Sequence, residues 1–326
     1  MNKTKAQSTV FNEILLSNFI DKILCWVDRN ISYFSLPNHK DIEANSEAEI
    51  TFSLQHKAFI ELGIAYFLMN RYPQMRQRQE FRILLKHIQK EIQKSNITFN
   101  MFRRVNLFYF YLLVYSCLIT CDLQVNNLKI SLQKIIEQNY VGAIERQPWA
   151  KIELKYYLEI GGFEYPIPDY KSLYEQSSAF LLPSPIYLSN MDTYILTHAI
   201  FYLSDFGQRD LKPILLERYD ETREYIMLLL GLYTRKCNWD LVGELLMCCS
   251  FLHISHCSSL IELAWKGVFQ AQNLQGFIPG IHFGKQKKEN TSEEDIDGLS
   301  IFRSNYHPTL VALLTSTFYL YGRDAL

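Results

Sequence analysis

Residues 105–121 read VNLFYFYLLVYSCLITC, an apolar run without a charged side chain. A run of about 17 residues is at the short end of what a membrane-spanning helix needs. It also contains Tyr109, Tyr111 and Tyr115, whose hydroxyl groups find partners more readily in a protein interior than in lipid. Since a helix that is apolar all round must be buried on every side, we expect an inner helix of a large helical protein here and no membrane span.

The rest of the chain is rich in helical signals and poor in turn signals. Hydrophobic residues make up 48% of the 326 residues, and there are only 13 glycines and 10 prolines. A β-rich chain of this length needs more turn residues, so helices are favoured. Helical periodicity recurs over the segments 10–29, 50–70, 79–94, 101–120, 126–139, 149–161, 170–180, 191–205, 211–236, 240–252, 258–272 and 306–321.

These segments alternate between very apolar and more amphipathic, which predicts an inner and an outer layer of helices. No strict repeat period is present, so the chain is not a consensus solenoid. We predict an all-α fold of about twelve helices, either closed into an α/α toroid or left as a curved helical repeat. A single helical domain would span 1–326, with 1–160 as its first half and 161–326 as the half that carries the polar motifs.

Charge and the N-terminus restrict the partners and the compartment. With 33 basic and 34 acidic side chains, the chain has no excess of positive charge for a phosphate backbone, so we expect no nucleic-acid partner. The polar residues 1–9 lack the apolar region of a signal peptide. We therefore expect a cytoplasmic protein with reduced cysteines. The charged stretch 285–294 is expected to be poorly ordered.

Residues 192–207, DTYILTHAIFYLSDFG, contain the most informative polar pattern. If the helix is continuous, Tyr194, His198, Tyr202 and Asp205 form one narrow stripe. Such a stripe can present a histidine and a carboxylate to a ligand, or it can be a buried polar network. An acid near a helix C-terminus opposes the helix dipole. That misfit favours a functional role.

A second pattern combines thiols and imidazoles. If the helix continues past residue 252, one face, within about 100° of arc, holds Cys249, His253, His256 and Cys257. Thiolate with imidazole suits zinc or another divalent ion. The alternative is that a cysteine-rich apolar helix simply packs in the core.

His307, directly before Pro308, is a third candidate. We expect it at a helix N-terminus, where the dipole disfavours protonation. A neutral imidazole there can ligate a metal or act as a base, or it can cap and pack.

Two motifs carry a resemblance to known proteins. T-H-x-x-F-Y-x-x-D-F-G at Thr197–Gly207 and Y-H-x-T-L-V at Tyr306–Val311 resemble an uncharacterised bacterial family found in secondary-metabolite and modified-peptide gene neighbourhoods. The resemblance covers mainly residues 159–321. The helix that ends at residues 270–276 and the restart at 306 are similar to the repeats of α/α-toroid proteins, which include terpenoid cyclases, protein prenyltransferases and lanthionine cyclases.

The chain also departs from those toroid families. No Trp follows Gly276, the acidic D-x-D-D motif is only partly present at residues 295–298, and the zinc ligands of lanthionine cyclases are not reproduced at matching spacing. The resemblance therefore implies the fold more than any of those activities.

Three functional hypotheses follow. The leading one is a biosynthetic enzyme that binds a small molecule or a peptide in a helical cavity. Its lining would be Tyr194, His198, Tyr202, Asp205 and His307, with the histidines as metal ligands or acid–base groups and Asp205 orienting them. The second is a non-catalytic scaffold that binds a peptide or a partner enzyme. The third is a helical protein stabilised by a metal at the Cys249 pattern.

Overall fold

The computed structural model describes residues 13–37, 54–94, 101–102, 105–121, 125–256, 258–281 and 298–322. Within these ranges the regular elements are all helical, which confirms the all-α prediction. The longer helices are α1 (Glu13–Arg29), α3 (Leu54–Met69), α5 (Gln79–Lys94), α7 (Phe108–Ile119), α8 (Asn126–Glu137), α10 (Pro148–Gly161), α12 (Asn190–Leu203), α14 (Arg218–Arg235), α15 (Trp239–Phe251), α16 (Ser259–Ala271) and α18 (Gly298–Tyr321). The short ones are α4 (Pro73–Arg76), α9 (Tyr140–Ala143), α11 (Tyr170–Glu175), α13 (Lys212–Leu215), η1 (Ile31–Phe34), η2 (Val105–Leu107), η3 (Ser178–Phe180) and η4 (Pro185–Tyr187).

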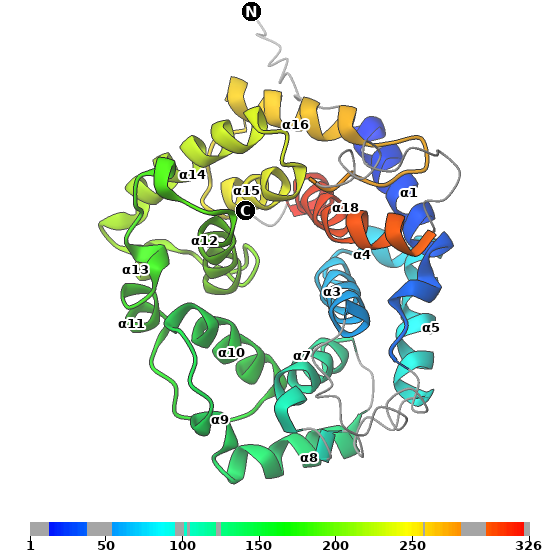
Figure 1. Cartoon of the computed structure of the whole chain (residues 1–326), viewed down its shortest axis with the longest axis vertical. Coiled ribbons are helices and arrows are strands. Elements are labelled where there is room, and N and C mark those ends of the chain that lie inside the picture. The colour runs from blue at the N-terminus through cyan, green and yellow to red at the C-terminus, as the bar shows by residue number, and fades with distance from the viewer. Residues whose placement is uncertain are drawn as a thin grey trace, which may run out of the picture.

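The helices form two concentric layers (Figure 1). The inner layer consists of α3, α7, α10, α12, α15 and α18. Each inner helix packs against the next along the chain, and α18 packs against α3, so the inner contacts form a closed cycle. Helices α1, α5, α8, α14 and α16 lie outside them and cover their outward faces.

Helix α7 shows why the inner layer is so apolar. It contacts α3 and α10 on its two sides and α8 behind it, so nearly all of its side chains are buried. The prediction of an inner helix within residues 105–121 is therefore confirmed. Across the described ranges, no helix is both long enough and apolar enough to cross a membrane.

The first and last described helices lie side by side, because α1 packs against α18. Trp26 of α1 stacks on Phe302 of α18, with ring centroids 6.1 Å apart and an interplanar angle of 11°. The same indole contacts Phe277. The turn before Phe277 needs a glycine, since Gly276 has φ +102° and an added Cβ would lie 2.3 Å from the carbonyl oxygen of Lys22.

Three helix boundaries differ from the expected ones. Helix α12 ends at Leu203 rather than at residue 205. The segment 211–236 is divided into α13 and α14, because Leu216 adopts φ +49°. Helix α18 begins at Gly298, eight residues before the predicted start, and has Pro308 in its interior. The stretch 285–294 lies outside the described residues.

Candidate functional site

A cluster of carboxylates and imidazoles lies where four inner helices face one another. We call it the carboxylate–histidine cluster, and it comprises Glu61 of α3, Tyr194, Thr197 and His198 of α12, Asp240 and Glu244 of α15, and His307 of α18.

His307 contacts three carboxylates. Its Nδ1 lies 2.9 Å from Oε2 of Glu61, at hydrogen-bonding distance. Its Nε2 lies 3.4 Å from Oδ1 of Asp240 and 3.7 Å from Oε1 of Glu244. The same Oε1 of Glu244 is 3.6 Å from Nε2 of His198. Glu244 is therefore shared by two imidazole rings.

The second oxygen of each α15 carboxylate is held by α12. The hydroxyl of Tyr194 donates to Oδ2 of Asp240 at 2.5 Å, and the hydroxyl of Thr197 donates to Oε2 of Glu244. Asp240 and Glu244 are four residues apart, so they project from the same face of α15 one turn from each other. These bonds fix which oxygens face His307.

The cluster is buried to different depths. The side chain of Glu244 is only 2% exposed, whereas those of His198 and His307 are 34% and 27% exposed. An ionised carboxylate is rarely buried this deeply unless it is paired. The imidazoles, by contrast, can be reached by solvent or by a small ligand.

The neighbouring charges shift several pKa values. Burial opposes the protonation of His307, but Asp240 and Glu61 outweigh it and raise its pKa well above the ordinary value. Burial likewise opposes the protonation of His198, and Glu244 outweighs it and raises the pKa. Burial would raise the pKa of Glu244, but the two histidines lower it to about 2. Burial raises the pKa of Asp240. His307 lowers it and Glu244 raises it, and the net shift is upward. Asp240 is thus the cluster's most readily protonated carboxyl.

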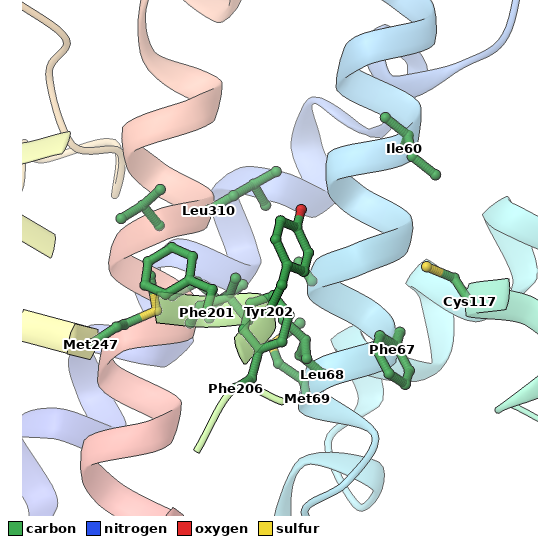
Figure 2. Close-up of a cluster of buried hydrophobic side chains, with 14 of the residues drawn as sticks. Ile60, Phe67, Leu68, Met69, Cys117, Phe201, Tyr202, Phe206, Met247 and Leu310 are labelled. Atoms are coloured by element: carbon green, nitrogen blue, oxygen red, sulfur yellow. The ribbon is translucent and has the colours of Figure 1, made fainter. Parts of the chain in front are cut away.

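The ring of His198 stacks on Phe201, with ring centroids 5.8 Å apart, and Phe201 belongs to an apolar layer that is drawn in Figure 2. It contains Leu68 of α3, Phe201 of α12, Met247 of α15 and Leu310 of α18, all nearly buried. On each of these helices the polar residue comes first in sequence and the apolar residue follows three to seven positions later. The four helices therefore run in the same direction, and they stack a polar layer on an apolar one.

Residues 20–317 match the family model described as Domain of unknown function (DUF6895). The chain belongs to the DUF6895 family. The match runs from α1 into α18 and so includes every member of the carboxylate–histidine cluster. It is wider than the resemblance expected mainly over residues 159–321. No curated protein and no solved structure matches the chain.

In this DUF6895 member, three of the residues expected at the site meet in the cluster. They are Tyr194, His198 and His307. Tyr202 is on the same helix, but its hydroxyl donates to Oε1 of Glu153 on α10, at 2.5 Å. It lies beside His198, with ring centroids 6.3 Å apart.

The prediction that Asp205 continues the α12 stripe is wrong. The helix ends at Leu203, and Asp205 has left-handed backbone, with φ +47°. Its carboxylate accepts hydrogen bonds from Arg71, at 2.7 Å, and from Tyr156, at 2.8 Å. Arg71 also donates to the backbone carbonyl of Asp205. The acid thus has a cationic partner, which removes the conflict with the helix dipole.

We expect Asp205→Asn to weaken the fold rather than the cluster. The change leaves the guanidinium of Arg71 without its anionic partner. Because both side chains are partly exposed, the free energy of unfolding should fall by only about 1–2 kcal/mol. Urea denaturation measures this fall, and a loss under about 0.5 kcal/mol would show that the ion pair contributes nothing to stability.

The metal site expected at Cys249, His253 and His256 does not form. Helix α15 ends at Phe251, and His253 has φ +52°, so the common helical face is lost. The thiol of Cys249 is buried beside Met227, and the ring of His256 packs on Tyr319. Among the described residues, the group that could share one ion is instead Asp240, Glu244 and His307. Cys257 lies outside the described residues.

The expected position of His307 was also wrong. It lies well inside α18, so the dipole at the helix N-terminus does not act on it. The carboxylates around it favour the protonated imidazole instead of the neutral one.

Sequence reasoning missed the acids of the site, Glu61, Asp240 and Glu244. They lie within the otherwise apolar runs of α3 and α15, where Lys57 of α3 is the other charged residue. A carboxylate in such a run is a signal of a buried polar partner. The one-turn spacing of Asp240 and Glu244 was a second signal.

Proposed function

We propose that this chain is an enzyme whose catalytic centre is the carboxylate–histidine cluster, set inside an α/α toroid. The observation that supports it best is the sharing of buried Glu244 by two imidazoles that stay partly exposed. Stability alone does not favour such an arrangement, because buried ion pairs seldom repay the cost of desolvation. Buried charges with shifted pKa values are typical of catalytic sites.

His198 is the proton-transfer group in this proposal. Glu244 raises its pKa and so favours the protonated imidazole, which can donate a proton to a leaving group or a carbonyl oxygen. Glu244 fixes the orientation of the ring through Nε2, and Tyr194 holds Asp240 beside it. We place the reaction in a secondary-metabolite or modified-peptide pathway, acting on a small molecule or a peptide.

A genetic complementation experiment tests the proposal without knowledge of the substrate. The gene is deleted in the native host and replaced by the wild type, by His198→Gln, or by His253→Gln as a control. The control residue is exposed and lies outside the cluster. General acid–base catalysis contributes about 10²–10⁴-fold to rates, so we expect His198→Gln to abolish the metabolite that the wild type restores.

The readout is mass spectrometry of the metabolites at matched protein levels. Full restoration by His198→Gln would remove His198 from the catalytic role. Restoration by His253→Gln is expected and shows that an imidazole lost elsewhere has no effect.

A non-catalytic scaffold is the second candidate, because one outer surface exposes large apolar side chains. Leu181, Ile186 and Tyr187, in the connection between α11 and α12, are 69%, 86% and 84% exposed. Exposed apolar patches of this kind mark sites of protein contact. On this hypothesis His198→Gln lowers the metabolite only in proportion to the amount of folded protein, and Tyr187→Ser lowers it without loss of stability.

A further inference from the structure

We propose that Asp240, Glu244 and His307 bind one divalent transition-metal ion of the Zn²⁺ class. One ligand atom from each residue lies within 4.8 Å of the other two. This site is independent of the catalytic proposal, since the ion could be structural or catalytic.

The distances within the group fit ligands of a common ion better than direct hydrogen bonds. Nε2 of His307 lies 3.4 Å from Asp240 and 3.7 Å from Glu244. Charge-assisted N–H···O bonds are about 2.7–2.9 Å long. Tetrahedral zinc with bonds of about 2.1 Å keeps its ligand atoms roughly 3.4 Å apart. The two separations from Nε2 of His307 are therefore of the length expected between ligands of one ion.

In each proposed ligand residue, the polar atom that would face away from the ion already has a hydrogen-bond partner. Nδ1 of His307 is hydrogen-bonded to Glu61, Oδ2 of Asp240 accepts from Tyr194, and Oε2 of Glu244 accepts from Thr197. Metal-binding histidines commonly donate their second N–H to a carboxylate, and metal-binding carboxylates are themselves hydrogen-bonded. Each ligand thus has one fixed atom and one atom directed at the common point.

Asp240 provides an independent observation. The residue is only 8% exposed, yet its Oδ1 has no hydrogen-bond partner within the described part of the chain. A buried carboxylate oxygen without a hydrogen bond is costly, and its 3.4 Å contact with Nε2 of His307 is longer than a charge-assisted hydrogen bond. A divalent cation would give this oxygen a direct ligand bond.

His198 lies beside the proposed site but outside the three-residue group. Its Nε2 is 3.6 Å from the same oxygen of Glu244, so it would face a water bound to the ion rather than ligate the ion itself. Mixed imidazole and carboxylate donors suit Zn²⁺, Mn²⁺ and Fe²⁺, whereas Mg²⁺ and Ca²⁺ favour oxygen donors alone. Zn²⁺ is therefore the appropriate first probe.

The test is calorimetric titration of the chelator-treated full-length protein with Zn²⁺. We expect the wild type to bind one ion, and Asp240→Asn and His307→Gln each to weaken binding by at least about tenfold. Glu61→Gln, which removes the hydrogen-bond partner of Nδ1, should weaken it by about 10–100-fold. His253→Gln and Cys249→Ser are the controls and should bind as the wild type does.

Substitution with Co²⁺ gives a second measurement that does not depend on the variants. Imidazole and carboxylate ligands give visible ligand-field bands without the intense near-ultraviolet bands of thiolate ligands. The inference would be overturned by any of three results. The wild type could bind no Zn²⁺, binding could survive both His307→Gln and Asp240→Asn, or the Co²⁺ spectrum could show thiolate ligands. If the wild type binds Zn²⁺ and the His198→Gln variant still supports the pathway, the metal site is retained and the catalytic proposal is rejected.

Discussion

Replacing Glu244 by glutamine should lower the free energy of unfolding of the metal-free protein by about 3–5 kcal/mol, the usual cost of removing one partner of a buried ion pair. For a chain of this size, that corresponds to a fall in Tm of roughly 4–7 °C. The reason is that His198 and His307 both lose the carboxylate that they share. Glutamine keeps the size of the side chain and can still accept a hydrogen bond from Thr197. The loss of stability therefore measures the contribution of the charge.

The loss should also depend on pH, and the sign follows from the pKa shifts. The pKa of Glu244 is lowered to about 2, because the two histidines outweigh burial. Its contribution is therefore present above its ordinary pKa of about 4.5 and is lost as the pH falls toward 2. The pKa of His307 is raised, so its contribution is present below about pH 6.5 and is lost as the pH rises through the raised value. The difference between wild type and variant is thus greatest between about pH 4.5 and 6.5.

Thermal unfolding of both proteins across this pH range makes the measurement, with chelator present throughout. Glu221→Gln is the matched control, since Glu221 pairs with Arg218 on the surface and is 54% exposed. Its loss should be under about 1 kcal/mol. Equal losses for Glu244→Gln and Glu221→Gln would mean that the cluster holds no buried ion pair.

The two layers of the fold were predictable because inner and outer helices differ in composition. The apolar run of α7 can only be buried, and most of the charges of α5 face outward, with Glu91 as a buried exception. Part of the site was also predictable, since Tyr194 and His198 are one turn apart on one helix. The partners of His307 were not. Glu61 is 246 positions away in sequence, and only the contact between α3 and α18 brings the two together.

Asp205 illustrates why helix ends are harder to predict than helix faces. The pattern of residues 192–207 continues past the point where α12 stops. The stop is set by a tertiary contact, because Arg71 binds both the carbonyl and the carboxylate of Asp205. Arg71 is 134 positions away, and no local pattern encodes it. The same holds for His253, whose left-handed backbone ends the apparent thiol–imidazole face.

Trp26→Ala should be as damaging as the change at Glu244, for an entirely apolar reason. The indole is 1% exposed and lies between α1 and α18, against Phe277 and Phe302. Truncating a buried Trp to Ala costs about 3–5 kcal/mol, from lost burial and the cavity left behind. Urea denaturation should show this loss without the pH dependence expected for Glu244→Gln, because no charge is removed.

Leu263→Ala is the control, since Leu263 is 57% exposed on α16 and its truncation should cost under about 0.5 kcal/mol.

The effect of Trp26→Ala should extend beyond stability. Trp26 packs where the first and last helices meet, and α18 must stay against α3 for Glu61 to reach His307. Hydrogen exchange should therefore rise in α1 and α18 before it rises in α10, which lies on the opposite side of the ring (Figure 1). Uniform exchange along the chain would instead mean that the ring unfolds as one unit and that its closure has no separate stability.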